Sequence, residues 1–167
     1  LVNQEVHTLN VVPMTLVSYS ILSPQDGARD PWRTFYFKPR SFVLEVALLD
    51  IQGNPMDPTI ALASDVNQPF AVTVTGPGGS DLSDKIVLQT TDIPGVWRAS
   101  TEEFTAKGTY VIRIKPKAKL RSAHVWDPHP KDSITVERIE NRFIWVLPSI
   151  AAMIAMAIAA WGIYQFQ

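Results

Sequence analysis

The chain contains no cysteine, and this absence excludes several classes of chemistry at once. Without thiols there is no disulfide framework, no thiolate metal site and no cysteine nucleophile. No charge of one sign dominates either, because 15 Lys and Arg stand against 16 Asp and Glu, for a formal net charge of −1. A nucleic-acid-binding domain usually carries a strong basic excess, so we expect no nucleic acid among the partners.

The sequence also lacks recognisable catalytic motifs. There is no Gly-x-Ser-x-Gly elbow, and the glycine-rich residues 76–79 are not followed by the Lys-Ser/Thr of a phosphate loop. We therefore expect neither enzyme activity nor a cofactor. His124, Asp127 and His129 are close in sequence and could supply two imidazoles and a carboxylate to a metal. Because prolines interrupt this segment, we interpret it as a loop and keep metal binding as a minor alternative.

One long uncharged run is present, over residues 143–164. A helix of about 22 residues spans roughly 33 Å, which matches a hydrocarbon core of about 30 Å. Residue types that typically lie at membrane interfaces occur near its ends: Arg142, Trp145, Trp161 and Tyr164. We therefore predict a single transmembrane helix, with residues 165–167 as a short tail. The alternative, a buried helix of a soluble protein, fits poorly with so small a domain.

Small residues recur along this predicted helix, at Ala151, Ala155 and Ala159, with Gly162 close to the same line. Such a stripe lets a second helix approach closely within lipid, so it predicts a helix-packing interface. The alternative is that alanine is present only because it favours helix.

The orientation of the chain is less directly indicated. The arginines before the helix would place the large domain in the cytoplasm by the positive-inside rule. The domain's β-rich character favours the opposite side, and so does the start at Leu1, which indicates a removed targeting segment or a fragment of a longer protein. We expect an extracytoplasmic domain, whether periplasmic, extracellular or lumenal.

The residues before the predicted helix indicate a mainly β fold. Thirteen prolines disfavour long helices, and six apolar runs are bounded by turn residues, at 15–22, 41–51, 70–75, 85–89, 96–100 and 109–115. We predict a two-sheet antiparallel sandwich over residues 1–115, with the role of residues 1–40 undetermined. Side-chain alternation predicts its core at Phe42, Leu44, Val46, Leu48, Val72, Val74, Tyr110, Ile112 and Ile114.

Two stretches carry a family resemblance. Residues 92–97 (DIPGVW), then Phe104 and residues 107–114 (KGTYVIRI), are similar to the last hairpin of bacterial immunoglobulin-like modules. Residues 41–55, a strand followed by an Asp-x-x-Gly-Asn-Pro turn, resemble an early strand of such modules. The resemblance covers about residues 41–115 and implies an immunoglobulin-like sandwich of the membrane-anchored kind. It marks a fold more than a function.

Between the expected sandwich and helix, residues 116–142 are rich in proline and charge. We predict a stalk there, with one further strand at residues 133–139. Five basic residues at odd positions would line one face if the preceding strand continued: Arg113, Lys115, Lys117, Lys119 and Arg121. Such a face could meet anionic headgroups or an acidic partner. The alternative is an ordinary solvated strand edge.

These patterns favour a single-pass accessory or structural subunit. Its helix would contact the lipid bilayer and the integral membrane subunits of a larger complex, while the sandwich scaffolds or stabilises that complex. The alternatives are a cell-surface binding module, such as the membrane-proximal domain of a receptor or adhesin, and a metal-handling accessory protein. The sequence identifies no ligand.

Overall fold

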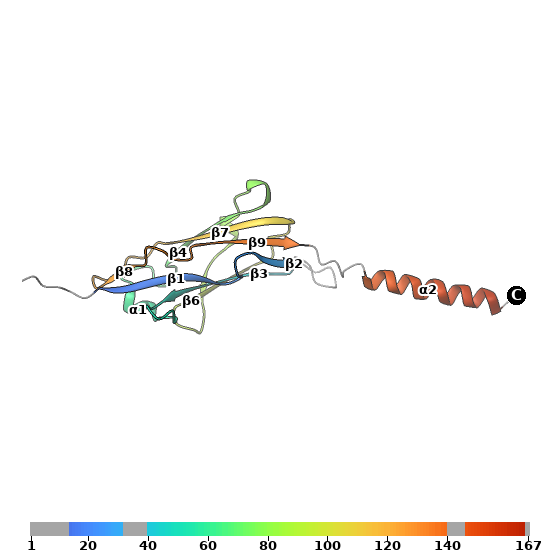
Figure 1. The fold of residues 1–167 in the computed structure, drawn as a ribbon, viewed down its shortest axis with the longest axis horizontal. Helices are drawn as coiled ribbons and strands as arrows, with labels where there is room; N and C mark the ends of the chain where they lie inside the picture. Colours follow the sequence, from blue (N-terminus) through green and yellow to red (C-terminus); the bar gives the residue numbers. More distant parts are fainter. Residues whose placement is uncertain (1–13, 32–39, 140–145, 166–167) are drawn as a thin grey trace, which may run out of the picture.

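The computed structural model describes residues 14–31, 40–139 and 146–165 (Figure 1). Within these ranges the chain forms nine strands in two sheets. The strands are β1 (Thr15–Ser23), β2 (Ala28–Pro31), β3 (Phe42–Leu49), β4 (Phe70–Thr75), β5 (Gln89–Thr90), β6 (Val96–Thr101), β7 (Gly108–Pro116), β8 (His124–Trp126) and β9 (Ser133–Ile139). The helices are α1 (Pro58–Ala61) and α2 (Val146–Gln165), with 3-10 turns η1 (Pro77–Gly79) and η2 (Ser83–Lys85).

The strand order identifies the architecture as an immunoglobulin-like sandwich. One sheet has the order β5-β6-β3-β1-β8 and the other β2-β9-β7-β4. If β1, β3, β4, β5, β6, β7 and β9 are taken as strands A to G, these are the ABED and CFG sheets of that fold. β2 is an additional strand at the edge of the second sheet, and β8 is an additional strand at the edge of the first.

The core lies between the two sheets. Trp97 of β6 meets Phe70 of β4 edge to face, with the ring centroids 5.4 Å apart, and Tyr19 of β1 lies at the same distance from Phe70. The residues predicted from alternation are confirmed as buried, except that Val72 is only partly buried. Each strand points every second side chain inward, so the apolar faces of the two sheets meet and leave water.

A tyrosine fixes the turn before β7. The hydroxyl of Tyr110 donates a hydrogen bond to the carbonyl oxygen of Ala106 at 2.9 Å. Its ring is 1% exposed and stacks on Phe104 at a centroid distance of 5.0 Å. This arrangement is the tyrosine corner of immunoglobulin-like domains, which ties the connection before the strand to the strand itself. Burial raises the pKa of Tyr110, so the hydroxyl stays protonated and remains a donor.

Three expectations need correction. Residues 116–139 are not a stalk, because β9 pairs with both β7 and β2, and β8 pairs with β1. The sandwich therefore continues to Ile139, and the strand predicted at residues 133–139 is confirmed. The sheets are not purely antiparallel, because the β1–β8 and β2–β9 pairs are parallel. The strand predicted at residues 85–89 is shorter, since only Gln89–Thr90 pairs with β6.

The helix α2 follows the sandwich in the chain and is drawn beyond it in Figure 1. It has no acidic residue in its first turn and no basic residue in its last. None of the helices within the described ranges is long and apolar enough to cross a membrane. Residues 143–145 of the segment predicted to span one, with Trp145 among them, and Arg142 lie outside those ranges.

Candidate functional site

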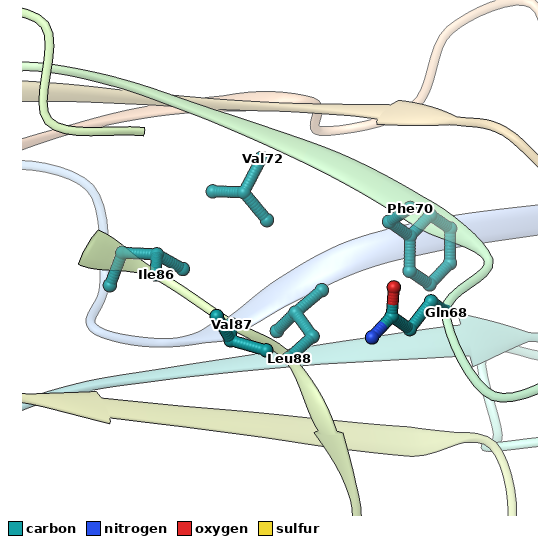
Figure 2. Close-up of a pocket in the computed structure, with 6 residues that line it drawn as sticks. All are labelled: Gln68, Phe70, Val72, Ile86, Val87 and Leu88. Carbon is teal, nitrogen blue, oxygen red and sulfur yellow. The ribbon is translucent and has the colours of Figure 1, made fainter. Parts of the chain in front are cut away.

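A shallow apolar groove opens between the edges of the two sheets. β4 is the last strand of one sheet, and β5 is the last strand of the other. Residues 86–88, which lead into β5, run opposite β4 without belonging to a strand. The side chains that line the cavity are Gln68, Phe70, Val72, Ile86, Val87 and Leu88 (Figure 2), and they enclose about 140 Å³.

The side chains that line the groove are mainly apolar, and polar atoms also contribute to its surface. Ile86 and Leu88 are 7% and 6% exposed and belong to the core, whereas Val87 between them is 57% exposed. Phe70 and the partly buried Val72 form the opposite wall, and Gln68 supplies the one polar side chain of the lining (Figure 2). Apolar cavities of about 150 Å³ can hold a group as large as benzene. The groove is therefore large enough for one aliphatic or aromatic side chain.

The backbone beside this groove has unused hydrogen-bonding capacity. Along an antiparallel pair, residues alternate between bonding the partner strand and pointing away from it. The N–H of Ile114 donates to the carbonyl of Asp132, on the β9 side, at 2.7 Å. Ile114 is the register partner of Val72, so the N–H and C=O of Val72 point away from β7. At Val72 they therefore face the open edge of the sheet.

Further along β4 the same edge is covered by the chain itself. The N–H of Val74 donates to Ser83 Oγ at 3.0 Å, and the N–H of Leu82 donates to the carbonyl of Val74 at 2.9 Å. The Ser83 hydroxyl donates in turn to the carboxylate of Asp81 at 2.6 Å. This bond and the bond from the Ser83 N–H lower the pKa of Asp81, so the carboxylate stays ionised and holds the turn. The open part of the edge is thus confined to the start of β4.

The outer surface of the sheet next to this edge is basic. Arg113 and Lys115 are exposed on β7, and they are the register partners of Thr73 and Ala71 on β4. Neither forms an ion pair with another residue in the described part of the chain. Two uncompensated cations therefore lie one strand away from the open edge, separated from it by two small side chains.

Comparisons with known proteins find a similar solved structure but do not assign the chain to a family. No family model matches the chain, and no curated protein matches it. Among solved structures, the crystal structure of the Lin-41 filamin domain is similar, with a TM-score of 0.40 and 20% sequence identity. The match covers 72% of this chain and 93% of that chain. The immunoglobulin-like description given above follows from the strand order itself.

The other three residues of the predicted basic face follow along the chain. Lys117 and Lys119 are exposed, and their backbone N–H groups bond the carbonyl of Pro69 and the hydroxyl of Ser64. Arg121 differs, because its Nε donates to two carbonyls at α1, those of Thr59 at 3.1 Å and Leu62 at 3.2 Å. Arg121 thus acts as a cap on the short helix. The alternation of exposure continues to residue 121, and the basic face over these five residues stays a prediction.

The candidate metal residues are placed in and after β8. Asp127 accepts a hydrogen bond from the hydroxyl of Ser18 at 3.1 Å and another from the backbone N–H of His129 at 2.9 Å, which makes it a turn residue. His124 lies in β8 and His129 is exposed beyond it. Within the described ranges, no three His, Asp or Glu side chains are grouped so that they could hold a metal ion.

The residues predicted to form a helix interface lie on α2. Ala151, Ala155 and Ala159 are exposed, and Gly162 belongs to the same helix. Trp161 is 67% exposed, and Tyr164 lies in the last turn of α2. No described side chain of the sandwich covers the alanine stripe, which leaves it open to another molecule.

The groove residues were not predicted as a site. Val72 and Val74 were expected in the core, and residues 85–89 were expected as a strand. The one sequence signal is the run Ile86-Val87-Leu88, which is apolar at three successive positions. A strand with one buried face and one solvated face alternates apolar and polar residues instead. In an extended chain Val87 points away from Ile86 and Leu88, and the structure leaves its side chain exposed beside the groove.

Proposed function

We propose that this chain is an accessory or structural subunit of a membrane-embedded complex. In this proposal α2 and the residues flanking it attach the sandwich to the bilayer and to a partner helix, and the sandwich lies on the extracytoplasmic side. The observation that carries the proposal is the exposed apolar surface of α2. Its large exposed side chains are Ile150, Met153, Ile154, Met156, Ile158 and Trp161.

An uncovered surface of this kind is unfavourable in water. Soluble monomers rarely expose apolar patches above a few hundred Å², and larger patches mark contact with lipid or with another protein. The apolar side chains of α2 are distributed on all sides of the helix, with no polar face. A helix that is hydrophobic all round is found in a protein core or in a membrane. The membrane part of the proposal rests on the uncharged sequence of residues 143–164, which begins before the described helix.

The alanine stripe indicates how the helix would assemble. Ala151, Ala155 and Ala159 recur at intervals of four residues, and small side chains allow the backbones of two helices to approach closely in lipid. Lipid tails pack equally well against isoleucine, so a stripe of alanine favours a protein contact on that side of the helix. The helix would then set both the position and the stoichiometry of the sandwich.

The test is purification of the full chain from its own membranes in mild detergent. We expect integral membrane subunits to co-purify in fixed stoichiometry, and Ala155→Leu to abolish their recovery because the larger side chain separates the two helices. Met156→Leu is the matched control, since it changes a neighbouring exposed residue without adding bulk to the stripe. A single monodisperse species from the wild-type chain would refute the proposal, as would equal recovery with Ala155→Leu. Protease protection of the sandwich in sealed vesicles tests its side of the membrane.

One feature favours the alternative of a cell-surface binding module. The open edge of β4 offers the sandwich a contact of its own, independent of the helix.

A further inference from the structure

We propose that the β4 edge binds an extended segment of a partner protein, with an apolar side chain in the groove and acidic side chains on the outer face. The first step of the argument is the backbone. At Val72 both the N–H and the C=O point to the open edge, next to the apolar groove. A second extended backbone offers an acceptor and a donor at the matching spacing, which is the basis of recognition by strand addition.

The second step is the side chain that enters the groove. A residue placed opposite Val72 in an added strand points its side chain to the same face of the sheet as Val72. That face leads into the cavity between Phe70 and Leu88 (Figure 2). Because the cavity measures about 140 Å³ and five of its six lining side chains are apolar, it favours a valine, leucine or phenylalanine side chain over a polar one.

The third step is the charge of the neighbouring positions. The residues before and after the inserted one point outward, beside Ala71 and Thr73 of β4. Beyond these two small side chains lie Lys115 and Arg113. The added strand and β7 would lie two strand spacings apart, which is about 10 Å. An acidic side chain on one and a long basic side chain on the other together span that distance. Charge complementarity therefore selects Asp or Glu at both outward positions, and the partner segment reads acidic–apolar–acidic.

The structure also limits the register. Past Val74 the edge is bonded by Leu82 and Ser83, so the added strand cannot run alongside the end of β4. The contact is therefore short and centred on Val72. A short contact of this kind predicts modest affinity, which suits a partner segment already held nearby by the helix assembly.

The experiment uses the full chain in detergent micelles and fluorescein-labelled eight-residue peptides that alternate glutamate and valine. Fluorescence anisotropy measures the dissociation constant. We expect this peptide to bind, and a lysine-for-glutamate peptide to bind about tenfold more weakly because the outward charges are reversed. The proposed strand runs antiparallel to β4, so the valine opposite Val72 exchanges both backbone hydrogen bonds with it, and N-methylation of the valines should abolish binding. N-methylation of the glutamates is the matched control, because it places the methyl groups on the far edge of the peptide.

Charge reversal in the protein gives the reciprocal test. Arg113→Glu with Lys115→Glu should reverse the preference, so that the lysine peptide binds better than the glutamate peptide. Lys119→Glu with Lys131→Glu makes the same change in net charge away from the β4 edge and should leave the preference unaltered. The proposal is overturned if both N-methylated peptides behave alike, if the preference does not respond to the reversal, or if the chain occupies its own edge as a dimer without peptide. Because binding is measured in micelles, it is independent of whether α2 pairs with another helix.

Discussion

Arg138 lies near the end of β9, and its replacement by methionine should destabilise the sandwich strongly. The Arg138 side chain is 1% exposed and forms an ion pair with Asp30 of β2, which is 20% exposed. Its Nε donates to the carbonyl of Phe104 at 3.2 Å, and its Nη2 donates to the carbonyl of Arg40 at 2.9 Å. The guanidinium also lies 5.8 Å from the centre of the Phe42 ring. One cation therefore joins β2, β9, the connection before β7 and the start of β3.

The magnitude follows from what the substitution leaves behind. Methionine keeps most of the hydrocarbon contact, so the loss is largely polar. Asp30 would remain mostly buried with only the more distant and more exposed Arg40, whose Nη1 lies 3.9 Å from its carboxylate, and two carbonyls would lose their donors. Removing one member of a buried ion pair costs about 3–5 kcal/mol, and the residual exposure of Asp30 places this case near the lower end, at about 3 kcal/mol. That is a large part of the 5–15 kcal/mol that stabilises a typical domain.

The assay is urea unfolding of the full chain in micelles, followed by tryptophan fluorescence. A loss of about 3 kcal/mol lowers the unfolding midpoint by about 1–3 M urea. The neighbouring pair of the same ladder supplies the control. Arg29 and Glu137 are bonded at 3.0 Å, but their side chains are 74% and 47% exposed. Arg29→Met should therefore cost no more than about 1 kcal/mol. If Arg138→Met shifts the midpoint no further than Arg29→Met, the buried cation does not organise this end of the sandwich.

Two further predictions concern single turns of the fold. Tyr110→Phe removes the hydrogen bond to Ala106 without changing the ring, so it should lower the free energy of unfolding by about 1 kcal/mol, measured by urea titration; an unchanged midpoint would show that the hydroxyl contributes nothing. Gly95→Ala should cost about 3 kcal/mol or more, because φ is +79° and the new Cβ would clash with the carbonyl oxygen of Met56. Gly53 has φ +83° but nothing within 4 Å, so Gly53→Ala should cost only about 1 kcal/mol; equal losses would rule out the close approach at Gly95.

The central strands were predictable because their burial is decided locally. In β3, Phe42, Leu44, Val46 and Leu48 alternate with less buried residues until the end of the strand, and strand geometry alone then dictates which side chains face inward. Such a pattern needs no knowledge of the partner strand. The turns at residues 52–55 and 76–79 were predictable for the same reason, since both carry the glycines and prolines that end a strand.

The edge strand β2 was not predictable in this way. Its four residues have no apolar alternation, and it pairs in parallel with a strand more than a hundred positions later in the chain. Asp30 reads as an ordinary loop acid until β9 brings Arg138 opposite it. The same non-local pairing explains why residues 116–142 were interpreted as a stalk. Their prolines and charges signal irregular chain, and only the second sheet shows that β9 has a place between β2 and β7.

The groove illustrates the limit of sequence reasoning about sites on this fold. One wall comes from the edge strand β4 and the other from the irregular residues 86–88 that lead into β5, and neither wall carries a motif. What makes it a candidate is the combination of an unbonded Val72 backbone, an apolar cavity and two cations on the adjacent strand. The basic alternation from Arg113 to Arg121 was visible in the sequence, yet Arg121 faces the carbonyls of α1 and only Arg113 and Lys115 flank the open edge. Spacing in the sequence therefore does not decide which cations could meet a partner. The element that lies beside each cation decides it.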